Sequence, residues 1–145
     1  MPPTLRPEIT LEVLNEKGGE YLPGFLGMEM TELLPGSLSS RMAVRKLHFA
    51  PNDFLHAASV VALADTTCGY ACLAHLPPGA ESFTTIELKS NHLGTVREGR
   101  IVCTATAQHL GRNTQVWDAV VSDEASGRKI ALFRCTQMVL WPRNN

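Results

Sequence analysis

The chain has 145 residues, with 13 Lys and Arg against 14 Asp and Glu, and a formal net charge of -1. This length is enough for a domain with its own hydrophobic core, and we expect a single domain over residues 1–145. The near-zero charge excludes a global basic field of the kind that attracts nucleic acid or anionic lipid, so neither partner is expected.

Three elements are expected before residue 50. Residues 7–17 carry apolar side chains at helical spacing and are followed by two glycines, which indicates a short amphipathic helix. The apolar run at residues 25–33 suggests a strand. A Pro35-Gly36 turn then reverses the chain, and residues 37–49 are expected to return as a second strand of a hairpin.

One long helix is expected over residues 55–73, after a Pro51-Asn52-Asp53 turn. The segment is Ala-rich and apolar on nearly every side, which is typical of a helix buried all round. The surrounding apolar stretch still contains two histidines, an aspartate and two threonines, which is too polar for a good membrane span. The N-terminus also lacks the apolar core of a secretory signal, so a cytoplasmic protein is expected.

Four strand-like runs follow, separated by turn signals: residues 82–93, 100–109, 114–122 and 129–140. In the first run, Ile86 and Leu88 should share one face, with Thr85 and Glu87 on the other. The element order α-β-β-α-β-β-β-β predicts an α+β fold in which an antiparallel sheet of about six strands wraps around one central helix.

The four cysteines form no CxxC pair: Cys68, Cys72, Cys103 and Cys135. In a reducing compartment such residues usually act as small buried hydrophobic side chains. The spacings do not favour a structural zinc site, and no bound metal or cofactor is expected.

Asp65 is the one acid in the middle of the most apolar helix. Because burying an unpaired carboxylate is costly, its side chain should be hydrogen-bonded, protonated or directed into a cleft. Two interpretations stay open from the residues alone. Asp65 is either a working acid in a cleft or a structural acid that caps a loop or pairs with an arginine.

His56 stands where the long helix should begin. A helix N-terminus offers free N–H groups and partial positive charge, which suits a carbonyl oxygen that becomes an oxyanion. The donor would be the Ala57 N–H, whereas His56 itself could simply order the turn. Ala57 and Asp65 lie about 12 Å apart along the axis, at 1.5 Å per residue. A single carbonyl cannot reach both on one helix, so the enzyme interpretation predicts a dimer with sites shared between antiparallel helices.

Other catalytic motifs are absent: the sequence has no GxSxG elbow, Walker loop, GxGxxG or HExxH. The Gly111-Arg112 turn after a strand could hold a phosphate through backbone N–H groups and a guanidinium. A plain hairpin turn is the simpler interpretation of the same residues.

The order of elements resembles the hotdog fold, with the sheet around the central helix. The segment from Leu55-His56-Ala57-Ala58 to Ala64-Asp65-Thr66 resembles the LHGG…ALAD signature of the PaaI-type acyl-CoA thioesterases. Residues 84–91 and 111–118 resemble the same family, and the resemblance covers roughly residues 20 to 140.

The resemblance implies hydrolysis of an acyl-CoA or aryl-CoA to free acid and coenzyme A. Asp65 matches the helix carboxylate that acts as nucleophile or general base, and the Ala57 N–H matches the donor that polarises the thioester carbonyl, with His56 before it. A homodimer would be required, assembled as a homotetramer through a dimer of dimers.

Further residues enter through the same resemblance. Thr85 matches a small hydroxyl residue that positions water, and Gly111 and Arg112 match a turn near the nucleotide end of coenzyme A. The family's amide six residues before the histidine is Ala50 here, and Asn52 is the nearest amide to take its place.

The sequence departs from the family pattern at two more positions, and two other activities stay open beside thioester hydrolysis. Ala57 replaces the family's usual glycine, and Gly69 stands where some relatives carry a hydroxyl. The rivals are a hotdog hydratase or dehydratase and a non-catalytic acyl-CoA-binding protein.

Overall fold

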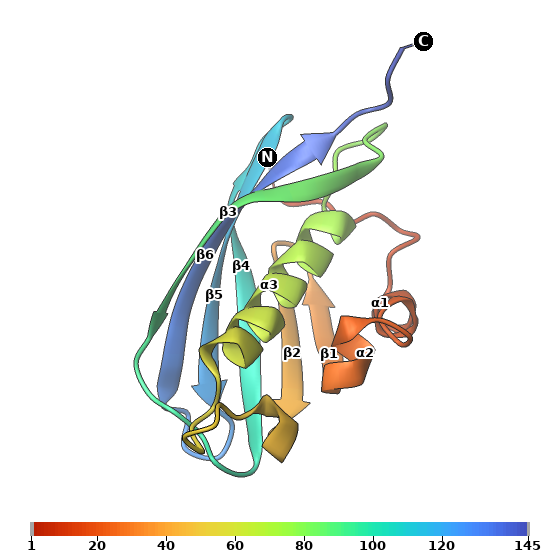
Figure 1. The fold of residues 1–145 in the computed structure, drawn as a ribbon. Helices are drawn as coiled ribbons and strands as arrows, with labels where there is room; N and C mark the ends of the chain where they lie inside the picture. The colour runs from red at the N-terminus through yellow and green to blue at the C-terminus, as the bar shows by residue number, and fades with distance from the viewer. Residues whose placement is uncertain (1, 145) are drawn as a thin grey trace.

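A curved sheet of six strands wraps around one long helix, α3, in the computed structural model, which describes residues 2–144 (Figure 1). All neighbouring strands are antiparallel. The elements in chain order are α1 (Leu11–Lys17), α2 (Leu22–Leu26), β1 (Met28–Leu34), β2 (Ser37–Ala43), the 3-10 helix η1 (Lys46–His48), α3 (Ala57–Ala74), β3 (Ser82–His92), β4 (Arg100–Leu110), β5 (Thr114–Asp123) and β6 (Lys129–Leu140).

The strand order across the sheet is β1-β2-β4-β5-β6-β3. β3 comes directly after α3 in the chain but pairs with β6, the last strand. It therefore forms one edge of the sheet, and β1 forms the other. The predicted α+β hotdog fold, an antiparallel sheet of six strands around one central helix, is confirmed.

The core lies between α3 and the helix-facing side of the sheet. Alternate residues of β5 and β6 are buried, as expected for strands with one covered face. Leu63 of α3 and Trp117 of β5 are completely buried in this core. The four cysteines are free thiols within it.

Three hydrogen bonds hold the start of α3, two of them to His48 at the end of η1 and one to the loop after β3. The His56 N–H and the Ser59 Oγ both donate to the His48 carbonyl, at 2.9 and 2.8 Å. The Leu55 N–H donates to the Thr95 Oγ1 at 3.2 Å, which ties this end of the helix to the loop after β3. The helix N-terminus is therefore held in a defined place.

The end of α3 is fixed through His75, which is buried. Its Nε2 accepts the Gly36 N–H at 2.8 Å, so Nδ1 carries the proton and donates to the Ala71 carbonyl at 2.7 Å. The Gln115 side chain donates to the His75 carbonyl at 3.1 Å. Burial lowers the pKa of His75, in agreement with a neutral ring.

Two predicted strands are shorter than expected. The predicted strand at residues 25–33 begins only at Met28, because residues 22–26 form α2, with Pro23 in its first turn and Gly27 in the left-handed region at φ 81°. The predicted strand at residues 37–49 ends at Ala43. The chain then turns inward as η1, where the ring of buried His48 accepts the Arg45 N–H.

The prediction that Thr85 shares a face of β3 with Glu87 is wrong, because the strand contains a bulge. Thr85 pairs with Gln137 and Glu87 with Thr136, which leaves Ile86 as an extra residue. Thr85 and Leu88 therefore lie on the same, helix-facing side, opposite buried residues of β6. The sequence carries no local signal for this bulge.

α3 is not buried all round, as its composition had suggested. Its buried residues lie toward the sheet and toward α2, whereas Ala57 and Ala58 are exposed, and Val61, Ala62 and Asp65 are half-buried. By length and mean hydropathy (1.4) α3 could cross a membrane, but 56% of it is buried inside the fold, and core helices share these properties.

Candidate active site

Asp65 lies on the incompletely covered side of α3, and its carboxylate has no partner. The side chain is half-buried, and the buried Oδ1 atom makes no hydrogen bond within residues 2–144. Within that range no arginine pairs with it and it caps no loop, so one subunit supplies neither of the contacts that the structural interpretation requires. Burial raises the pKa of Asp65, because desolvation disfavours the carboxylate form.

β3 runs past this side of α3 in the opposite direction. Leu55 before the helix bonds to Thr95 after the strand, whereas Gly69, late in the helix, contacts Phe83 early in the strand. In Figure 1 the first part of β3 crosses close to the C-terminal half of α3. Asp65 lies one helical turn before Gly69, and Thr85 lies two residues after Phe83 on the strand. Asp65 and Thr85 are therefore at about the same height along the axis of α3.

The Thr85 hydroxyl is directed by the strand next to it. Its Oγ1 donates to the Oε1 of buried Gln137 at 2.7 Å. The hydroxyl oxygen keeps its lone pairs free to accept a hydrogen bond. Thr85 can therefore accept a hydrogen bond from a water molecule.

The N-terminus of α3 offers one unused donor. His56 is the N-cap residue, and its Nδ1 accepts the Ala58 N–H at 2.9 Å. The His56 carbonyl accepts the N–H groups of Ser59 and Val60. Within residues 2–144 the Ala57 N–H has no partner, so it is the exposed donor at the positive end of the helix.

One subunit does not bring this donor and Asp65 together. They are eight residues apart on one continuous helix, which amounts to about 12 Å along the axis. Within one subunit the Ala57 N–H and the Asp65 carboxylate therefore cannot contact the same small group.

Asn52 and Arg112 lie in turns. The Asn52 Oδ1 accepts the Phe54 N–H at 3.2 Å, so its acceptor is used locally. Gly111 and Arg112 form the β4–β5 hairpin loop, where the Arg112 guanidinium stacks on the Trp141 ring at 4.4 Å. The structure brings neither turn into contact with Asp65.

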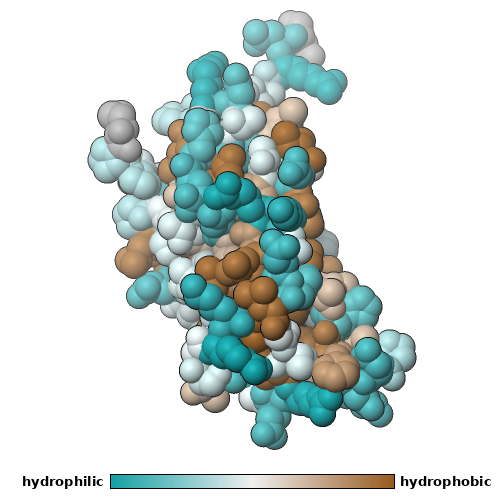
Figure 2. Space-filling view, turned by 90° about the vertical axis from the view of Figure 1, so that its left-hand side faces the viewer, coloured by the Kyte–Doolittle hydropathy of each residue, from teal (hydrophilic) through white to brown (hydrophobic). Residues whose placement is uncertain are grey.

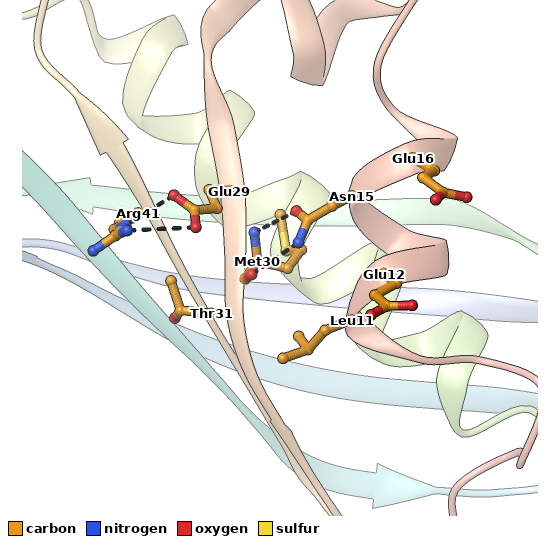
Figure 3. Close-up of a pocket in the computed structure, with 8 residues that line it drawn as sticks. All are labelled: Leu11, Glu12, Asn15, Glu16, Glu29, Met30, Thr31 and Arg41. Carbon is orange, nitrogen blue, oxygen red and sulfur yellow. Dashed lines mark hydrogen bonds and ion pairs between the residues drawn. The ribbon is translucent and has the colours of Figure 1, made fainter.

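Two hollows lie elsewhere on the described surface. One, between α1 and β1, is lined by Glu12, Glu16 and Glu29. In it Glu29 pairs with Arg41, and Asn15 bonds to the Met30 backbone (Figure 3). The other lies between residues 2–8 and the end of α3. Neither contains Asp65.

The β3 edge is unpaired and carries two exposed apolar side chains. Ile86 is 53% exposed and Leu88 44% exposed on this strand. Figure 2 looks onto the side of the molecule where β3 lies, and hydrophobic atoms gather near the middle of that face. An open strand edge with exposed apolar side chains is a surface suited to pairing with another chain. Sequence reasoning missed this surface, because the edge position depends on non-local strand order.

The chain belongs to the thioesterase superfamily, whose family model matches residues 52–130. It is 32% identical to the 1,4-dihydroxy-2-naphthoyl-CoA hydrolase of Escherichia coli, over 92% of this chain and 96% of that protein. It is also 32% identical to the proofreading thioesterase EntH of Klebsiella pneumoniae, with the same coverage of each chain.

Solved structures agree. The fold matches a mutant thioesterase from Pseudomonas aeruginosa with a TM-score of 0.88 and 30% identity, covering 94% of this chain and 97% of that one. The PaaI protein of E. coli shares the fold at a TM-score of 0.74 and 22% identity, over 81% and 83% of the two chains. The resemblance to PaaI-type hotdog thioesterases is confirmed, and the protein is a thioester hydrolase.

Proposed function

We propose that this thioester hydrolase cleaves the CoA ester of an acyl or aryl acid, in a site shared by two subunits. The observation that carries the proposal is the partnerless, half-buried carboxylate of Asp65 on the open side of α3. An unpaired buried acid costs stability, and such residues cluster at functional sites. The CoA thioester named for the E. coli relative supports the substrate class.

The dimer forms through the β3 edges, with the two α3 helices antiparallel. If Ala57 of one subunit faces Asp65 of the other, the two-fold axis passes close to Val61, midway between them. Val61 is half-buried and lies on the incompletely covered side of α3. Pairing of two β3 edges would cover Ile86 and Leu88 and remove the unpaired edge.

In each site the thioester carbonyl accepts the Ala57 N–H of one subunit, at the positive end of α3. Asp65 of the other subunit removes a proton from water, while Thr85 accepts a hydrogen bond from the same water. The hydroxide adds to the carbonyl carbon, and the oxyanion is stabilised by the Ala57 N–H and the helix dipole. The tetrahedral intermediate then expels the coenzyme A thiolate, which takes up a proton.

Direct attack by the Asp65 carboxylate is the alternative to this general-base route. It forms an acyl–aspartyl anhydride that water hydrolyses. The raised pKa of Asp65 suits both routes, because a more basic carboxylate is a stronger base and also a stronger nucleophile.

The remaining residues have supporting roles in this proposal. His56 holds the first turn of α3 through the Ala58 N–H and so fixes the direction of the neighbouring Ala57 N–H. Arg112, with Gly111, contacts a phosphate of the coenzyme A nucleotide, and Asn52 contacts the thioester region. These contacts are completed in a dimer of dimers.

Thiol release from CoA esters tests the activity. The wild type should release free thiol from saturated acyl-CoA substrates, which a hydratase cannot do. Asp65→Asn should lose at least about 100-fold in kcat, the usual contribution of a general base, and keep its fold and oligomeric state. Tight binding of CoA esters without any thiol release would instead make this chain an acyl-CoA-binding protein.

Mixing two inactive variants tests whether the site is shared. Asp65→Asn subunits keep Ala57, and Ala57→Pro subunits keep Asp65 but lack its N–H. A mixed dimer then has one intact site and one doubly defective site. Because random mixing makes half of the dimers mixed, about a quarter of the wild-type activity should return. No recovery after confirmed subunit exchange would show that Ala57 and Asp65 do not act together across the interface.

A further inference from the structure

We propose that Phe83 sets the acyl-chain length that the enzyme accepts, because its ring closes the apolar end of the site one helical turn beyond Asp65. This inference rests on the proposed function and adds a specificity-determining residue to it.

Phe83 and Gly69 form a matched pair. Gly69 is buried on α3, and a Cβ atom added to it would lie 3.2 Å from the Phe83 Cζ and 3.4 Å from its Cε2. The ring edge therefore fills the space that a side chain at position 69 would take. Since the ring already contacts the helix, it cannot move closer to α3 to make room.

The space behind the ring is packed core. Phe83 pairs with Val139 on β6, and Val139 is buried. Cys68 and Cys72, on either side of Gly69 along α3, are completely buried. An acyl chain extending from Asp65 in this direction therefore meets Phe83 and stops there.

The two halves of the substrate need different surroundings. The pantetheine and nucleotide of coenzyme A are polar and require a path to solvent, whereas the acyl group gains from apolar contact. From Asp65, the direction toward Gly69 and Phe83 is the buried and apolar one. The acyl group is therefore assigned to this side, with Phe83 as its end wall.

The experiment compares kcat/KM for acetyl-, butyryl-, octanoyl- and dodecanoyl-CoA in the wild type, Phe83→Ala and Phe83→Leu. Each additional methylene buried is worth about a fourfold gain. Space for two more methylenes in Phe83→Ala should therefore raise the octanoyl-to-butyryl ratio by about 15-fold. Phe83→Leu should give a smaller change in the same direction and guards against loss of folding in the alanine variant.

Two further variants sharpen the result. Phe25→Ala removes a phenylalanine that is 70% exposed on α2 and should leave the ratio unchanged. Gly69→Ala adds a methyl group that presses on the Phe83 ring, so it should lower the rate for longer chains instead of raising it.

The proposal is overturned if both Phe83 variants are folded and dimeric but keep the wild-type ratio within about threefold, a change smaller than one methylene gives. It is also overturned if Phe83→Ala weakens inhibition by free coenzyme A tenfold without changing the ratio, since Phe83 would then line the coenzyme A arm. Absence of thiol release by the wild type would instead refute the proposed function.

Discussion

Replacing Ala57 with proline removes a single hydrogen-bond donor from the proposed site with very little change to the fold. Ala57 is the first residue of α3, and its N–H has no partner within residues 2–144. Proline is favoured at this helix position, because its ring suits the helical φ and the missing N–H is not needed. The residue before a proline must be extended, and His56 already has φ -65° and ψ 133°.

The unused N–H and the extended His56 backbone set the expected size of the effects on stability and on kcat. The free energy of unfolding should change by no more than about 1 kcal/mol, as no hydrogen bond is lost and proline stiffens the unfolded chain. Removal of one oxyanion donor typically lowers kcat by about 100- to 1000-fold, which corresponds to roughly 2.7–4 kcal/mol of transition-state stabilisation. Ala57→Pro should therefore lose most of its kcat while keeping nearly all of its free energy of unfolding.

The assay is thiol release at saturating substrate, together with urea unfolding of the same preparations. Ala57→Gly keeps the N–H and should remain active, and Ala57→Val keeps the N–H while adding bulk. A kcat of Ala57→Pro within threefold of the wild type would refute the role of this donor. An equal loss in Ala57→Val would show that crowding, and not the donor, is responsible.

Three other predictions concern stability and reactivity. Burial raises the pKa of Asp65 above its usual 3.8, so the unfolded chain ionises first and wild-type stability falls as the pH rises through the folded-state pKa. The melting temperature of Asp65→Asn should therefore rise relative to that of the wild type between pH 4 and pH 7. A difference in melting temperature that stays constant over this range would contradict the prediction. Burial raises the pKa values of Cys72 and Cys103 to about 12. A disulfide reagent at pH 8 should therefore modify these two thiols only after urea is added. Rapid labelling of these thiols in the folded protein would contradict the prediction. Leu63→Ala should lower the free energy of unfolding by about 2–5 kcal/mol in urea titrations, because Leu63 is completely buried, and a loss below 1 kcal/mol would place it outside the core.

The sequence was sufficient for the fold class and for the central helix. Strong apolar character between two proline-containing turns predicts α3, and the position of Asp65 within it marks the acid as exceptional. The N-terminus of α3 was predicted two residues too early, but His56 and Ala57 were correctly placed at the helix start. These features depend on residues that are close in the sequence, so the local residue pattern is enough to predict them.

The features that sequence reasoning missed are non-local. The extra residue Ile86 reverses the faces of the second half of β3, and only the pairing with β6 reveals it. The contact between Gly69 and Phe83 depends on how α3 crosses that strand. The lack of a partner for Asp65 is likewise a property of the assembled subunit, since any arginine in the chain could have reached it.

The strand order also has a consequence for protein synthesis. β3 leaves the ribosome well before its neighbour β6, since β4 and β5 are made in between. Within the subunit β3 has no other strand to pair with, so it must wait for the last strand before it can join the sheet. A chain stopped after residue 128 would lose β6 and also leave β3 without a strand to pair with. The loss of this one strand therefore removes two strands from the sheet.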